Sequence, residues 1–152
     1  MVTKHVVVQA YEECWERDFL QIEKELREAL GELALRIEHV GSTAVRGLSA
    51  KPVIDIDVVI KDYSQFDNVV TSLNQIGYHH EGDLGIAGRE AFKYTGKEHL
   101  KKHHLYVCPQ DSPELKRHIA FRDYLRSHPE AVREYSRVSV SSGSRNPRRF
   151  LS

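Results

Sequence analysis

The sequence predicts an α/β (α+β) domain in which helices pack on a mixed β-sheet. Three observations lead to this prediction: an amphipathic helical repeat near the N-terminus, a strand of alternating apolar and acidic residues within 53–60, and two later helix starts that combine serine with proline. A chain of 152 residues is long enough to bury the core of one domain without disulfides or a structural metal.

The first half of the chain predicts two helices and two strands, preceded by a short strand at 6–9. The first helix has apolar residues at helical spacing and ends at Gly31; these residues are Trp15, Phe19, Ile22, Leu26 and Leu30. Residues 35–40 and 53–60 have strand patterns. Asp62 or Ser64 can cap the second helix, whose apolar stripe is Phe66, Val69, Val70, Leu73 and Ile76.

The second half predicts a hairpin followed by two helices. A short strand is expected at 78–80, a glycine-rich loop at 81–88, and antiparallel strands at 89–95 and 103–108. Ser112-Pro113-Glu114 opens a helix through about 126, and Ser127-His128-Pro129 opens another through about 137. The remainder is rich in serine and arginine, which predicts a domain at 1–138 and a flexible tail at 139–152.

Charge and cysteine content exclude several classes of protein. The 22 basic and 22 acidic residues cancel, which argues against nucleic acid or an anionic membrane as a partner. The two cysteines, Cys14 and Cys108, are typical of reduced thiols in a cytosolic protein. Without an apolar run of membrane-spanning length or a signal peptide, we expect a cytoplasmic protein. The sequence gives no indication of the oligomeric state.

A glycine-serine turn and two aspartates form the candidate site. Gly41 and Ser42 follow the strand at 35–40, and a small turn of this kind lets backbone amides and a hydroxyl approach a phosphate closely. Asp55 and Asp57 are two residues apart in a strand, so both side chains point to the same face. Paired carboxylates bind Mg2+ together with water and substrate phosphates, which predicts metal-dependent phosphoryl transfer.

Several alternatives remain open at this stage. A solvated strand face explains the two aspartates without any metal, and Ser42 lacks the surrounding motif of a serine hydrolase. Three cations, Arg46, Lys51 and Arg89, are candidates for binding phosphate or are ordinary surface residues. His103 and His104 must point to opposite faces of their strand, so only one of them belongs to the site, and Glu90 is a third acid only if its strand adjoins that of the aspartates.

These motifs together resemble the GrpB-like family, also called the UPF0157 group. The resemblance rests on Glu38-His39-Val40-Gly41-Ser42-Thr43-Ala44, on Lys51-Pro52-Val53-Ile54-Asp55-Ile56-Asp57-Val58, and on further matches at 82–86, 88–90, 103–108 and 121–125. That family is placed in the nucleotidyltransferase superfamily with DNA polymerase beta, and related domains occur fused to dephospho-coenzyme A kinase. The resemblance therefore implies a nucleotidyltransferase-like mixed sheet.

The resemblance also implies roles for individual residues. Asp55 and Asp57 would bind Mg2+ or Mn2+, and nucleotide phosphates would contact the turn and nearby cations, namely Gly41, Ser42, Thr43, Lys51 and Arg89. The superfamily usually has a third acid on a later strand, and here that strand carries His104 as the candidate catalytic group. The expected reaction transfers a nucleotidyl group from a nucleoside triphosphate to an unknown acceptor. The alternatives are an inactive nucleotide- or metal-binding module and a histidine-assisted metal phosphohydrolase.

Overall fold

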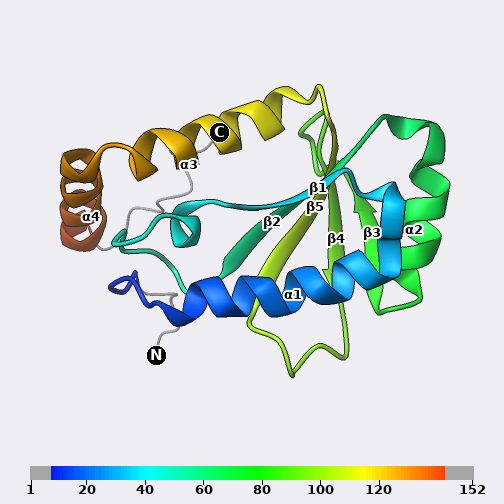
Figure 1. Cartoon of the computed structure of the whole chain (residues 1–152), viewed down its shortest axis with the longest axis horizontal. Helices are drawn as coiled ribbons and strands as arrows, with labels where there is room; N and C mark the ends of the chain where they lie inside the picture. Colours follow the sequence, from blue (N-terminus) through cyan, green and yellow to red (C-terminus); the bar gives the residue numbers. More distant parts are fainter. Residues whose placement is uncertain (1–7, 143–152) are drawn as a thin grey trace.

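A computed structural model describes residues 8–142 of the chain, and its centre is one mixed five-stranded sheet (Figure 1). The strand order is β1-β2-β5-β4-β3, where the strands in chain order are β1 (Arg36–Val40), β2 (Ile54–Ile60), β3 (Tyr78–Gly82), β4 (Glu90–Tyr94) and β5 (His103–Pro109). The two central strands, β2 and β5, run parallel, and all the other neighbouring pairs are antiparallel. The sheet is therefore mixed, as expected.

Helices α1 (Cys14–Leu30) and α2 (Phe66–Asn74) cover one face of the sheet and form the main apolar core. The predicted stripe of α1 is buried at all five positions, from Trp15 to Leu30. It packs with the apolar side chains of β2 that point to this face, which are Ile54, Ile56, Val58 and Ile60. The period of two in β2 and the helical period in α1 thus meet in one core, because each pattern places its apolar residues on a single side.

Helices α3 (Pro113–Arg126) and α4 (Pro129–Ser142) lie on the opposite side, with α3 above the sheet in Figure 1. Two smaller apolar clusters lie here. One joins Leu115 of α3 to Val59 and Tyr106 of the sheet, and the other joins Leu125 of α3 to Val132 of α4 and Leu48. Both faces of β2 are covered, because all seven of its residues are buried. Asp57 therefore lies beneath α3 and Asp55 keeps only a small exposed fraction, so the reading of this strand as having a solvated face is wrong.

The side of α3 that faces the sheet is largely polar. Its buried residues include Glu114, His118 and Arg122, which recur every four residues and therefore lie on one side of the helix. The helix starts as predicted: the Ser112 side chain accepts a hydrogen bond from the Leu115 amide, and Pro113 occupies the first turn. A polar stripe over the acidic strand means that α3 is part of the candidate site.

Two ends of the predicted fold differ from the structure. Helix α4 continues to Ser142, beyond the end expected near residue 137, so part of the predicted tail is helical. At the N-terminal end, Gln9 forms only an isolated bridge with Ala50, and residues 6 and 7 lie outside the described range. The division at 138/139 stays a prediction, and 143–152 are also outside the described residues. Within 8–142, none of the helices combines the length and apolar character needed to cross a bilayer.

Candidate functional site

The glycine-serine turn lies directly against the first aspartate. Val40, the last residue of β1, pairs with Asp55 of β2, and Gly41 follows with a φ of 76°. A Cβ atom on Gly41 would stand 2.5 Å from Oδ2 of Asp55 and 3.2 Å from its Cβ. Only glycine fits this position, because a side chain would meet both the carboxylate and an unfavourable left-handed backbone. The turn and Asp55 thus share one site.

His104 is the histidine that belongs to this site. It is the register partner of Asp55 across β2 and β5, and its Nδ1 atom lies 3.0 Å from Asp55 Oδ1. Both side chains keep some access to solvent, with exposed fractions of 35% for His104 and 12% for Asp55. His103 points to the other face, where its Nε2 atom is 2.7 Å from the Tyr78 hydroxyl. The expected opposition of the two histidines is confirmed.

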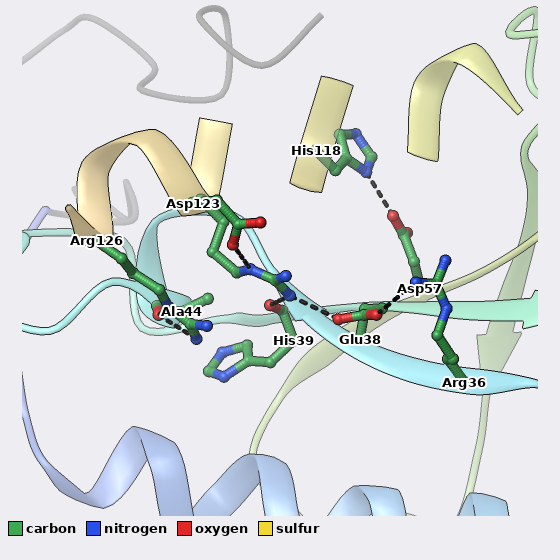
Figure 2. A network of polar contacts seen from close by, with 9 residues as sticks. Arg36, Glu38, His39, Ala44, Asp57, His118, Asp123 and Arg126 are labelled. Atoms are coloured by element: carbon green, nitrogen blue, oxygen red, sulfur yellow. Dashed lines mark hydrogen bonds and ion pairs between the residues drawn. The ribbon is translucent and has the colours of Figure 1, made fainter. Parts of the chain in front are cut away.

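Asp57 is held by a histidine from α3. His118 Nδ1 donates to Asp57 Oδ2 over 2.7 Å, and the Asp57 side chain has no solvent exposure (Figure 2). Burial raises the pKa of Asp57, although the hydrogen bond and charge of His118 oppose this shift. Burial alone would lower the pKa of His118, but the hydrogen bond to Asp57 and the nearby charges of Asp57, Glu114 and Asp55 raise it. Both shifts favour retention of a proton within the pair.

The second oxygen of Asp57 provides a test of whether a cation fits. Oδ1 is buried and has no hydrogen-bond partner among residues 8–142, and an unpaired buried carboxylate oxygen is costly unless a cation or donor satisfies it. Asp55 is close enough for its charge to act on Asp57. Among residues 8–142, no group of three or more histidine, cysteine or acidic side chains forms a protein-only metal cage. The two carboxylates fit Mg2+ or Mn2+ that takes its remaining ligands from water and phosphate.

A network of ion pairs fixes α3 to β1 and the turn (Figure 2). The Arg122 guanidinium donates to Glu38 Oε1 at 2.7 Å and to the carbonyl of His39 at 3.2 Å. One turn later, Nε and Nη2 of Arg126 donate to the carbonyl of Ala44 at 3.0 and 2.8 Å. Ala44 ends the short 3-10 helix η2 (Ser42–Ala44) that follows Gly41. Helix α3 therefore contacts both ends of the segment that carries the glycine-serine turn.

The hydroxyl groups of the turn are committed to protein partners. Thr43 Oγ1 lies 2.9 Å from His39 Nε2, and the Ser42 hydroxyl shares a hydrogen bond with Tyr135 of α4. Both residues are buried. His39 also stacks on Phe19 of α1, with ring centroids 4.7 Å apart. In this arrangement the turn offers a ligand its backbone more readily than its hydroxyls.

The predicted cations are divided between the site and its surroundings. The Arg89 guanidinium lies 4.1 Å from the centroid of Tyr106, the register partner of Asp57, and its positive charge lowers the pKa of Asp57. Lys51 lies in the loop before β2 and forms no hydrogen bond or ion pair with either aspartate in the described part of the chain. Glu90 is not a third acid of the site, because β4 adjoins β5 instead of β2 and the Glu90 carboxylate binds His80 at 2.7 Å. The alternative that included Glu90 is wrong.

Residues 5–149 match the protein family described as GrpB protein. The chain belongs to the GrpB family.

Relatives of this GrpB-family chain cover it almost completely. It is 35% identical to the glutamate-rich protein GrpB of Alkalihalophilus pseudofirmus over 93% of this chain and 83% of that protein. It is 33% identical to the UPF0157 protein YqkA of Bacillus subtilis over 95% of this chain, but it spans only 41% of that longer protein. A dephospho-CoA kinase of Mycolicibacterium paratuberculosis is 28% identical over 86% of this chain, which is 38% of the kinase.

Solved structures show the same fold. The GrpB protein from Enterococcus faecalis superposes with a TM-score of 0.75 at 32% identity, covering 86% of this chain and 79% of that one. Cid1 in complex with the UTP analogue UMPNPP superposes with a TM-score of 0.59 at 11% identity, covering 88% of this chain and 40% of that one. The GrpB-family chain therefore has a nucleotidyltransferase-like fold, and the low identity to Cid1 shows the fold alone.

Sequence reasoning missed the contribution of α3 and α4 to the site. A signal was present, because polar residues recur every four positions along α3 where a core-facing helix normally has apolar ones. These residues are Glu114, His118, Arg122 and Arg126. Tyr135 gave no comparable signal, since its contact with Ser42 depends on how α4 packs against the loop after β1.

Proposed function

We propose that this GrpB-family protein is a metal-dependent nucleotidyltransferase that moves a nucleotidyl group from a nucleoside triphosphate to an acceptor. The observation that carries the proposal is the approach of Gly41 to Asp55, where even a Cβ atom would stand 2.5 Å from the carboxylate. A phosphate seated on the backbone of this turn would be next to a carboxylate able to hold its counter-cation. The nucleotidyltransferase-like fold supports the same reading.

Asp55 and Asp57 are the residues that would hold Mg2+ or Mn2+. When bound, such a cation supplies a Lewis acid that neutralises charge on the transferring phosphoryl group. Asp55 already has solvent access, whereas Asp57 has none and is engaged by His118. The unpaired Oδ1 atom of Asp57 is the free acceptor that this role requires.

The other residues of the site act on the substrate or on the aspartates. Arg89 places a positive charge beside Tyr106 and near Asp57, where it would offset phosphate charge. His104 holds Asp55 by a 3.0 Å hydrogen bond and is accessible enough to accept a proton from an attacking hydroxyl group of the acceptor. Gly41 keeps the turn close to the carboxylate, which orients the phosphate for in-line attack.

Calorimetry with a nonhydrolysable triphosphate and Mn2+ tests the binding part of the proposal. The full chain should bind the complex, and Asp55→Asn should weaken binding at least about tenfold by removing one negative oxygen donor. Glu90→Gln is the matched control, because it makes the same chemical change at a carboxylate that binds His80 outside the site. Equal affinity of the Asp55→Asn variant and the wild type would contradict the proposed site.

A second candidate is a nucleotide- or metal-binding module without catalysis. It is favoured by the histidine on each aspartate, His104 on Asp55 and His118 on Asp57, since each contact occupies an oxygen that a cation would use. Product analysis separates the candidates over a panel of nucleotides and metals. Pyrophosphate release with an acceptor supports the transferase, binding without release supports the module, and free phosphate with a preference for transition metals supports the phosphohydrolase.

A further inference from the structure

A separate pocket lies between α3, α4 and the loop that follows η2. Its volume is about 670 Å³, which is within the range of small-molecule sites. Apolar side chains form one part of its lining and arginines another; the apolar residues are Ala44, Leu125 and Val132, and the arginines are Arg46, Arg126 and Arg133. None of the roles assigned to the aspartate site uses this pocket.

The charges around the pocket do not balance within residues 8–142. Glu16 also lines the pocket, but Arg46 binds it at 3.1 Å, so these two charges compensate each other. Arg126 donates to the Ala44 carbonyl, which is a neutral partner, and Arg133 forms no ion pair with any described residue. Two positive charges therefore face one cavity without a carboxylate in contact.

Arg126 faces the pocket beside a second cation of α3. Burial and the positive charge of Arg122 lower the pKa of Arg126, although the charges of Asp123, Glu16 and Glu38 oppose this shift. An anion bound beside Arg126 would favour its charged form. A dianionic phosphate matches two guanidinium groups, whereas a carboxylate would leave one of them uncompensated.

The pocket is distinct from the aspartate site because η2 separates them. Gly41 precedes η2 and touches Asp55, while Ala44 ends η2 and forms part of the pocket lining. A ligand in the pocket would contact Ala44 at the end of η2 and the first turn of α4, where Pro129 and Val132 lie. It would not need a metal or a nucleotide at Asp55.

We propose that this pocket binds a phosphate monoester with an apolar body, with the phosphate on Arg126 and Arg133 and the apolar body against Leu125 and Val132. The site stands independently of the nucleotidyltransferase proposal, since that proposal gives none of these residues a contact with the aspartates, the metal or the nucleotide. Each part of this ligand matches one part of the lining: the phosphate matches the two arginines that form no ion pair with a described residue, and the apolar body matches the apolar side chains.

Phenyl phosphate is a suitable probe. It is titrated into the full chain in the absence of metal and nucleotide, and binding is monitored through the amide chemical shifts of the protein. We expect shifts at Ala44, Gly47 and Val132, and an affinity at least tenfold weaker in Arg133→Gln, which loses one charge-assisted contact. Lys116→Gln is the matched control, because it removes the same charge from an exposed position on α3 outside the pocket. The Asp55→Asn variant should bind phenyl phosphate as the wild type does.

Three further probes test the chemistry of the ligand. Inorganic phosphate should bind more weakly than phenyl phosphate because it lacks an apolar body, and phenol should bind more weakly because it lacks the dianion. AMP tests whether the pocket prefers a nucleotide to a simple phosphate ester. If AMP binds this pocket more tightly than phenyl phosphate does, the assignment of an apolar body is overturned. The proposal also fails if phenyl phosphate causes no shifts at the pocket, or if Lys116→Gln and Arg133→Gln weaken binding equally.

Discussion

Asp57 in β2 and His118 in α3 are joined by a 2.7 Å hydrogen bond from which solvent is almost excluded, with side-chain exposures of 0% and 8%. The pair links the central strand to the helix above it. Because both groups are buried, each depends on the other for compensation of its polar or charged atoms.

Removal of His118 should therefore destabilise the protein strongly. We expect His118→Ala to lower the free energy of unfolding by about 3 kcal/mol, since it leaves a buried carboxylate without its donor. Urea unfolding measures this change. The double variant, which combines His118→Ala with Asp57→Ala, should lose less unfolding free energy than the sum of the losses in the two single variants. Strict additivity of these losses would show that the pair is not coupled.

Gly41→Ala tests the contact between the turn and Asp55. The substitution combines a left-handed backbone with a Cβ atom 2.5 Å from Oδ2, and we expect a loss of about 3 kcal/mol. Gly96→Ala is the control, because Gly96 has a similar φ of 70° but no atom of the described residues within 4 Å of an added Cβ. It should cost only about 1 kcal/mol. Equal losses in thermal or urea unfolding would mean that the crowding at Asp55 has no effect.

His39 predicts a dependence of stability on pH. Burial and the charges of Arg126 and Arg122 lower its pKa from 6.5 to about 4, although the charge of Asp55 opposes the shift. Between these values the unfolded chain binds more protons, so the folded state is destabilised as the pH falls from 6.5 towards 4. At pH 5 the loss should be about 2 kcal/mol relative to pH 7.5.

The variant His39→Gln isolates this contribution, because glutamine can still donate to Thr43 but does not titrate. The wild type loses this stability on going from pH 7.5 to pH 5 and the variant does not. The free energy of unfolding of the variant minus that of the wild type should therefore rise by about 2 kcal/mol over this interval. Parallel pH curves for the two proteins would show that His39 is not the titrating group.

Arg122→Lys tests the attachment of α3 to β1. Lysine keeps the charge but cannot reach Glu38 and the His39 carbonyl with one planar group, so we expect a loss of about 1–2 kcal/mol. Arg117→Lys is the control on the same helix, since the Arg117 side chain is 55% exposed and, among the described residues, forms an ion pair with Glu114 alone. It should change stability by less than about 0.5 kcal/mol. A comparable loss in the control would remove the argument for a specific Arg122 contact.

The sequence was sufficient for the parts of the fold that depend on periodicity. The α1 stripe from Trp15 to Leu30 and the alternation in β2 each have a single period, and both are buried on the expected side. The contact of Gly41 with Asp55 was also predictable, because β1 and β2 are neighbours in the chain and pair directly. Local pattern and short connections fixed these relationships.

The rest of the site depends on tertiary packing that no local pattern encodes. His118 meets Asp57 across 61 positions of sequence, and Arg122 meets Glu38 across 84. The order of the strands likewise decided that Glu90 lies outside the site, because β4 pairs with β5 and not with β2, and that order follows from strand pairing over the whole sheet. The end of α4 was misjudged because its polar composition resembles that of a solvated tail.

The two sides of this sheet are held by different kinds of contact, and this has a consequence for local opening. Lifting α3 breaks ion pairs and exposes the two smaller apolar clusters around Leu115 and Leu125, whereas detaching α1 exposes the larger main core. Denaturant acts in proportion to newly exposed surface, so amide hydrogen exchange in α3 should respond weakly to urea while that in α1 follows global unfolding. The cover over Asp57 is thus more easily displaced than α1 on the other side of the sheet.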